Sequence, residues 1–205
     1  MSKKFVVAIS RQYGSGGHEI GRKLAKKLDI SFYDKELLTK IAKDSGMSED
    51  LVKYYDEMPS KSFLFSLAMD AYPMSFTEMP INQKVYQAQV DTIKKIANEE
   101  SCVIIGRCAD TILSDYENLV TVFIHAGMDA KIKRVMERDE LTREKAKDRI
   151  IKTDKKRASF YNYYSLEKKW GDAASHDLTI DSSKLGIDET VVMIYDYLKL
   201  RGFLS

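Results

Sequence analysis

Cysteine, proline, tryptophan and net charge are all scarce in this chain of 205 residues. Its two cysteines, Cys102 and Cys108, are too few for a disulfide framework and fit no zinc-ligand spacing. The net charge is only +2, so the molecule as a whole gives no electrostatic reason to expect a nucleic acid or an anionic membrane as partner. We therefore expect reduced thiols, no membrane and no nucleic acid.

Long apolar runs are missing as well. No stretch approaches the roughly 20 apolar residues that a membrane span requires. The apolar part of the N-terminal MSKKFVVAIS is too short for a signal peptide. Apolar residues make up 44% of the chain and charged residues 31%, as is typical of a soluble folded protein. We expect one cytoplasmic domain, because a chain of this length forms a full core that can carry inserted segments.

Short apolar runs alternate with helical patterns along the chain. Between the runs, apolar residues recur at helical spacing, most clearly over residues 85–97 and 142–164. Strands that alternate with helices predict an α/β fold with a parallel sheet covered on both faces, and ligands bind such sheets at the carboxyl ends of the strands. The predicted strands are residues 5–10, 31–33, 102–105, 120–125 and 177–181.

All three prolines fall between residues 44 and 82, where the periodic pattern is weakest. We interpret this stretch as short helices and a loop. Ser48 is the expected N-cap of one helix, since Glu49 and Asp50 follow it and acidic side chains favour the positive end of a helix dipole.

A glycine cluster joins the first predicted strand to the first predicted helix. Glycines allow positive φ and close approach of the backbone to a ligand, and the start of a helix presents free N–H groups to an anion. We favour phosphate binding here over a plain strand-to-helix turn. The residues assigned to this role are Gly14, Ser15, Gly16, Gly17, His18 and Glu19.

The glycine cluster nevertheless lacks the Walker A signature, G-x-x-x-x-G-K-[ST]. With Gly16 as the last glycine, Arg11 stands at the first glycine and Gly17 at the lysine. Moving the register by one residue puts His18 at the lysine but Gln12 at the first glycine. The missing lysine normally bridges the β- and γ-phosphates. Our hypothesis is that Arg11 swings in from the strand end to supply that charge.

Four stretches, in this order, resemble the cytidylate kinases, and more closely the group usually called cytidylate kinase-like proteins. They are AISRQYGSGG at 8–17, FYD at 32–34, GRCAD at 106–110 and LTIDSSKLG at 178–186. The resemblance implies a three-layer P-loop core with a five-stranded parallel sheet, a helical monophosphate-binding insertion and a basic helical lid.

The same resemblance divides the single domain into parts. It places the core at residues 1–33, 99–130 and 171–205, the monophosphate-binding region at 34–98 and the lid at 131–170. The family transfers a phosphoryl group from ATP, with Mg²⁺, to the 5′-phosphate of CMP or dCMP. The implied partners are therefore ATP, with Mg²⁺ of unknown ligands, and a nucleoside monophosphate. A monomer and a homodimer both remain open.

Positioning and positive charge do most of the work in phosphoryl transfer, and guanidinium groups grip phosphate oxygens in pairs. The lid suits this role, although each of its cations taken alone also fits a solvated helix face with nearby acids as partners. Arg11, Arg149 and Arg157 are the residues we assign to catalysis. The basic residues of the lid are Arg134, Arg138, Arg149, Lys156 and Arg157.

The resemblance also implies the residues that bind the acceptor. Arg107 corresponds to a family arginine that holds the acceptor's phosphate. Asp34 and Asp181 match family aspartates near the acceptor nucleoside, and Asp154 falls with Arg157 in an Asp/Arg-rich lid helix. For Asp34, the N-cap of the following helix is the alternative.

Three positions depart from the family pattern: Gly17 replaces the lysine, Glu19 the hydroxyl residue that follows it, and Cys108 an aspartate for which Asp110 could substitute. Nucleotide binding is therefore the firmer prediction, and phosphorylation of CMP the finer one. The alternatives are a non-catalytic nucleotide-binding or sensor protein, a kinase for another small phosphate acceptor, and a nucleic-acid surface on the basic residues 131–169. The near-neutral total charge opposes the last.

Replacing Arg11 by alanine tests whether it supplies the missing charge. A hydrogen bond to a charged group contributes about 1.5–3 kcal/mol, so the loss of such a contact weakens ATP binding by about 10-fold or more. Calorimetric titration of both proteins with ATP measures the change. An unchanged ATP affinity in Arg11→Ala removes the hypothesis.

Overall fold

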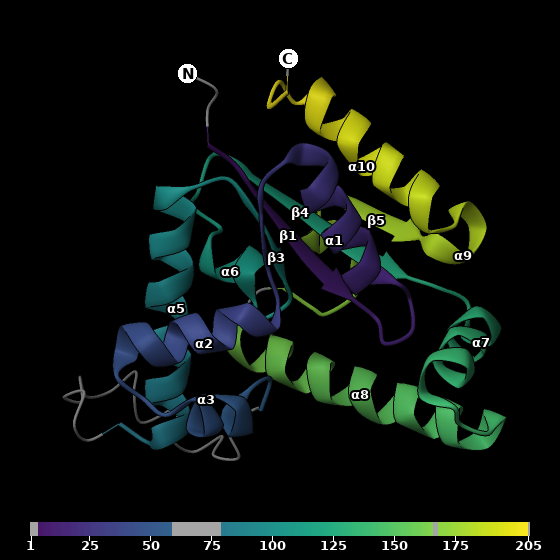
Figure 1. Cartoon of the computed structure of the whole chain (residues 1–205), viewed down its shortest axis with the longest axis horizontal. Helices are drawn as coiled ribbons and strands as arrows, with labels where there is room; N and C mark the ends of the chain where they lie inside the picture. Colours follow the sequence, from purple (N-terminus) through teal and green to yellow (C-terminus); the bar gives the residue numbers. More distant parts are fainter. Residues whose placement is uncertain (1–3, 59–78, 166–167, 205) are drawn as a thin grey trace.

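A parallel sheet forms the middle layer of the molecule (Figure 1). The computed structural model describes residues 4–58, 79–165 and 168–204. In these residues the strands pair in the order β2-β3-β1-β4-β5, with Val7 opposite both Val103 and Val120. The strands are β1 Val6–Arg11, β2 Ser31–Tyr33, β3 Cys102–Ile105, β4 Leu119–His125 and β5 Leu178–Asp181.

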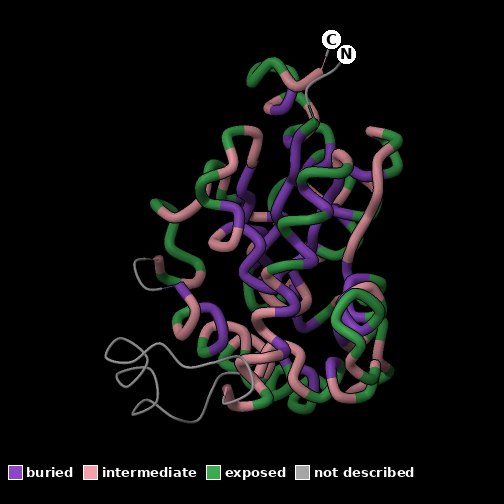
Figure 2. Tube along the Cα trace, turned by 90° about the vertical axis from the view of Figure 1, so that its left-hand side faces the viewer, coloured by how far each residue is buried: buried purple, intermediate pink, exposed green. Residues whose placement is uncertain are grey.

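Helices cover both faces of this sheet because successive side chains of a strand point to opposite sides. Val7 and Ile9 of β1 pack toward α1 (Gly17–Leu28) and α10 (Ile187–Leu200). Val6 and Ala8 pack toward the opposite layer. That layer contains α2 (Lys35–Ser45), α3 (Glu49–Tyr55), α5 (Ile81–Glu99) and α6 (Ala109–Ile112). Figure 2 shows the buried residues concentrated in the middle of the molecule, with exposed residues toward its outside.

Two helices lie at the carboxyl end of the sheet. They are α7 (Met128–Asp139) and α8 (Arg143–Tyr164), which pack on one another through a small apolar cluster that includes Val135 and Ile150. Figure 1 shows α8 running across the molecule from α3 to α7, below the ends of the strands. The last part of the chain holds a short 3₁₀ turn, Ala173–Ser175, and α9, Ser182–Leu185.

The predicted fold class is confirmed, and each predicted strand is present within a residue or two of its expected bounds. The helix expected over 85–97 is longer, because it begins at Ile81, after Pro80, and ends at Glu99. Ser48 caps α3 as expected, since its Oγ accepts a hydrogen bond of 3.2 Å from the Leu51 N–H. Most of the loop expected in the proline-containing stretch lies outside the described residues. Within the described ranges, none of the helices is both long enough and apolar enough to span a membrane.

Candidate functional site

The glycine loop connects β1 to α1 at the carboxyl edge of the sheet. Gly14 and Gly16 have φ of +77° and +83°, which only glycine adopts readily. The Ser15 hydroxyl donates to the Gln12 carbonyl at 2.8 Å and so closes the turn. Gly16 is the N-cap of α1 and has no side chain to cap the helix, although the Gly17 N–H makes a long 3.4 Å hydrogen bond to Oγ of Ser15. The loop therefore presents the first-turn N–H groups of α1 at the place where the sequence predicts a phosphate.

Gly17 is the position at which the lysine is missing, and the side chain of Arg11 fills the space there. A Cβ built on Gly17 would lie only 2.6 Å from Cβ of Arg11. The guanidinium of Arg11 then extends to Gly106, where a Cβ would overlap it. A lysine at position 17 and an arginine at position 11 are thus incompatible in this arrangement. The Cβ of Arg11 lies against the position that a side chain on Gly17 would fill, and its guanidinium lies beside Gly106, just after β3.

Glu57 lies between two arginines that are far apart in the sequence. Its carboxylate pairs with Arg11 Nη1 at 3.0 Å and with Arg157 Nε at 3.4 Å. Arg157 also donates to the carbonyl oxygen of Arg11 at 3.3 Å. All three side chains are at least 85% buried, so a carboxylate is held between two guanidinium groups almost out of water.

Arg107 forms the adjacent part of the same cluster. Its guanidinium is 4% exposed, binds Asp34, and makes two contacts with Asp56, at 3.2 Å and 3.1 Å. It also donates to the Ile105 carbonyl at 3.0 Å, and its own carbonyl accepts from Gln89 at 2.8 Å. Asp34 precedes α2 but makes no side-chain cap, so its carboxylate serves the ion pair. Asp34 and Arg107, both assigned to the acceptor from the sequence, are thus bonded to one another.

These contacts set the charge states of the cluster. Burial would raise the pKa of Glu57, but Arg11, Arg157 and Arg107 outweigh it and lower that pKa to about 2. Burial would also raise the pKa of Asp34, and Arg107 lowers it on balance. Burial lowers the pKa of Arg157 to about 10, with Arg11 acting in the same direction. All of these groups are therefore charged at neutral pH.

Three guanidinium groups face three carboxylates, so the cluster is neutral as it stands. The arginines are Arg11, Arg107 and Arg157, and we call them the arginine cluster. A cavity of only about 10 Å³ remains beside them, which is roughly the space of one water molecule. A phosphate group that binds these arginines needs the space that the carboxylates fill and the guanidinium groups with which they pair. It can enter only as a carboxylate leaves.

A second set of contacts joins α7 and α8 to the glycine loop. The Tyr13 N–H donates to Asp154 Oδ1 at 2.6 Å. Lys131 Nζ lies 3.2 Å from the other oxygen of Asp154 and 3.1 Å from Gln12 Oε1. Arg134 binds the Ser15 carbonyl at 3.1 Å. Sequence reasoning missed Lys131, although its spacing of four residues from the buried Val135 puts it on the inner face of α7.

Four other residues assigned from the sequence, His18, Glu19, Arg149 and Asp154, lie outside the arginine cluster. His18 is half exposed and lies 3.3 Å from Asp34, and Glu19 pairs with Lys23 on the surface. Arg149 is exposed and pairs with Asp139, which also accepts a hydrogen bond from the Tyr13 hydroxyl. Asp154 lies at the loop, not with Asp34 and Arg107.

Asp181 does not join the other predicted acceptor residues. It accepts a 2.9 Å hydrogen bond from the Ser183 N–H and caps α9. It follows β5, and β5 and β2 are the two opposite edges of the sheet, so Asp181 and Asp34 are separated by the width of the sheet. Asp110 does not replace Cys108 in the site either, since it is buried and accepts from the Tyr161 hydroxyl at 2.6 Å.

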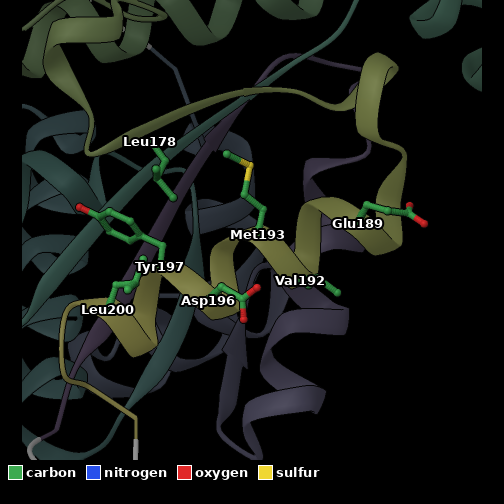
Figure 3. A pocket seen from close by; sticks show the side chains of 7 residues that line it. All are labelled: Leu178, Glu189, Val192, Met193, Asp196, Tyr197 and Leu200. Atoms are coloured by element: carbon green, nitrogen blue, oxygen red, sulfur yellow. The ribbon is translucent and has the colours of Figure 1, made fainter.

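A larger hollow, of about 440 Å³, lies elsewhere, on α10 and β5. Figure 3 shows its lining side chains, with Glu189 pointing away from Leu178 and Met193. The lining holds two acids, Glu189 and Asp196, and no basic side chain, so it would repel a phosphate. Among the residues that the structure describes, no group of three or more His, Cys, Asp or Glu is arranged to hold a metal ion.

Comparison with known proteins identifies the family. Residues 6–184 match the model of the cytidylate kinase-like family. The chain belongs to this family. It is 25% identical to the cytidylate kinase of Sulfolobus acidocaldarius over 201 residues, which cover 97% of each chain. The cytidylate kinase of Staphylothermus marinus is 22% identical and covers 95% of this chain and 96% of its own length.

Solved structures agree with the fold. An uncharacterized protein from Eubacterium ventriosum is 35% identical and superposes with a TM-score of 0.74, covering 96% of this chain and 99% of its own. The shikimate kinase of Bacteroides thetaiotaomicron, at 16% identity and a TM-score of 0.54, covers 95% and 98% and supports the kinase fold alone. Family and fold together support a nucleotide kinase, and the P-loop type of core is confirmed.

Replacing Glu57 by glutamine tests the charge balance of the cluster. It leaves two buried guanidinium groups without a counter-ion, so we expect the free energy of unfolding at pH 7 to fall by about 3 kcal/mol. The pKa of Glu57 is lowered from 4.5 to about 2, so its stabilisation is complete above pH 4.5 and is lost as the pH falls toward 2. The difference between wild type and variant shrinks over the same range.

Urea denaturation at pH 7, 5 and 3 measures these differences. Glu49→Gln is the matched control, because Glu49 begins α3, the helix just before Glu57, and pairs with Lys53 at an exposed position. Equal stability losses in the two variants at pH 7 would contradict the buried ion-pair network.

Proposed function

We propose that this protein transfers a phosphoryl group from ATP to a nucleoside monophosphate, with CMP or dCMP as the first candidate. The observation that carries the proposal is the buried arginine cluster beside the glycine loop, at the carboxyl edge of a P-loop kinase core. Family membership and the named relatives point to the same reaction.

In this proposal the loop binds the donor and the arginine cluster binds the acceptor. The carboxylate of Glu57 marks where an anionic group fits, between Arg11 and Arg157. The phosphate of the acceptor takes that position, and Arg107 provides a further cation held in place by Asp34. Residues 34–98 then act as the monophosphate-binding region and 131–170 as the lid, and the two separate to admit the substrates.

The chemistry is a transfer between two phosphates. The bond between the γ-phosphorus of ATP and the β–γ bridging oxygen breaks as an oxygen of the acceptor's phosphate bonds to that phosphorus. The products are ADP and a nucleoside diphosphate. Guanidinium groups stabilise the charge on the transferred group, and closure of the lid excludes water, which would otherwise hydrolyse ATP.

Mg²⁺ is proposed to arrive with ATP. The ion keeps several waters and binds largely through nucleotide phosphates, so it needs few protein ligands. This requirement is compatible with a site in which the described carboxylates are occupied in ion pairs. ATP as the donor also agrees with the cytoplasmic location predicted from the sequence.

A coupled assay of ADP release against a panel of nucleoside monophosphates tests the proposal. We expect turnover with CMP or dCMP, and we expect Arg107→Lys to raise the acceptor KM and lower kcat/KM by on the order of 100-fold, because lysine cannot form the paired contacts of a guanidinium. Arg143→Lys, at an exposed arginine of α8, is the control. Nucleotide binding in a calorimeter without turnover of any acceptor would favour the sensor alternative.

A further inference from the structure

Lys131 is a buried cation of α7 that contacts the glycine loop. Its side chain is 6% exposed, and its Nζ lies 3.1 Å from Gln12 Oε1 and 3.2 Å from Asp154 Oδ2. A lysine is rarely so deeply buried unless its charge is paired. The loop and the lid helix together provide the partners, so the ammonium group is fixed at the loop.

The carboxylate of Asp154 is held in the way that a P-loop holds a phosphate. One of its oxygens accepts the backbone N–H of Tyr13 at 2.6 Å, and the other binds the ammonium of Lys131 at 3.2 Å. In a P-loop, a backbone N–H of the glycine-rich loop and the ammonium of its lysine bind oxygens of the same nucleotide phosphate. Asp154 is bound by the same two kinds of donor. Asp154 therefore stands where an anion binds.

The other cations near the loop have different partners. The guanidinium of Arg11 points to Glu57 and Gly106, toward Arg107 and away from the loop. Arg134 donates to the Ser15 carbonyl and to the Ser182 hydroxyl, so it connects the loop to the start of α9. Of these three cations, Lys131 is the one that binds Asp154 directly, on the carboxylate that also accepts the Tyr13 N–H.

We propose that Lys131 supplies the positive charge that Gly17 cannot, and that it binds the terminal phosphates of the donor nucleotide. The proposal rests on the proposed function of this site. A donor phosphate takes the place of the Asp154 carboxylate, between the Tyr13 N–H and Lys131. Lys131 stays protonated throughout, forms no covalent bond, and neutralises charge on the phosphate oxygens. Asp154 returns when the product leaves.

Two substitutions at position 131 test the role of the charge. Lys131→Met removes it and weakens ATP binding by about 10- to 100-fold, as expected for the loss of a charged hydrogen bond, while Lys131→Arg restores most of the affinity. Calorimetric titrations with ATP and, separately, with CMP give the comparison. CMP affinity is expected to stay within about 2-fold, because Lys131 contacts no residue of the arginine cluster. Lys133→Met, at an exposed lysine of the same helix, is the control.

A double variant separates phosphate binding from the effect of an unpaired carboxylate. Lys131→Met removes the ammonium that pairs with Asp154, and the carboxylate without this counter-charge would itself repel ATP. In Lys131→Met/Asp154→Asn that repulsion is gone. ATP affinity that remains low in the double variant supports the proposal. Recovery to the wild-type value overturns it, since Lys131 then only neutralises Asp154.

Further outcomes separate this inference from the function on which it rests. If wild type binds ATP and Lys131→Met binds it equally well, the inference on Lys131 is wrong and the kinase proposal stands. If ATP and CMP affinities fall together with thermal stability, Lys131 has a structural role and the inference is again overturned. If wild type binds neither ATP nor ADP, the proposed function fails and the inference fails with it. Under the proposal, Arg11→Ala weakens CMP binding more than ATP binding.

Discussion

Three guanidinium groups lie out of water at the carboxyl edge of the sheet, and a buried charge is stable only beside an opposite one. The carboxylates that meet this need come from the start of α2 and from the residues just after α3, so the ion pairs tie these segments to β1, β3 and α8. Glu57 and Arg107 have φ of +52°, an unfavourable value for residues with a side chain. The backbone accepts this strain because the ion pairs fix both side chains.

The glycine loop also depends on contacts with other parts of the chain, because side chains of α7 and α8 bind it. The N-cap Gly16 has no side chain to cap α1; from the lid, α7 contributes Lys131, which binds Gln12, and Arg134, and α8 contributes Asp154. Each of these contacts crosses from the lid helices to the loop, so the conformation of the loop and the position of the two helices are coupled. Under the proposed function, donor binding and lid position would be coupled by the same bonds.

The strands could be predicted from the sequence because β-branched apolar runs are local signals. The loop could be predicted because Gly14 and Gly16 adopt positive φ, which glycine allows. The sequence cannot predict which strands are neighbours, and for that reason Asp181, correctly expected at a strand end, lies at the edge opposite Asp34. Glu57 follows a short helix in a stretch without clear periodicity. Lys131 is one cation in a basic stretch, and only its packing on the loop distinguishes it.

The crowding between Arg11 and Gly17 has a consequence for how such loops are recognised and altered. Because Cβ of Arg11 leaves no room for a side chain at position 17, the two positions are linked: any side chain at position 11 requires glycine at position 17 in this backbone arrangement. A single exchange of Gly17 for the usual lysine would meet a steric barrier unless residue 11 became glycine at the same time. A search pattern that pairs these two positions would find loops of this kind that the Walker A pattern passes over.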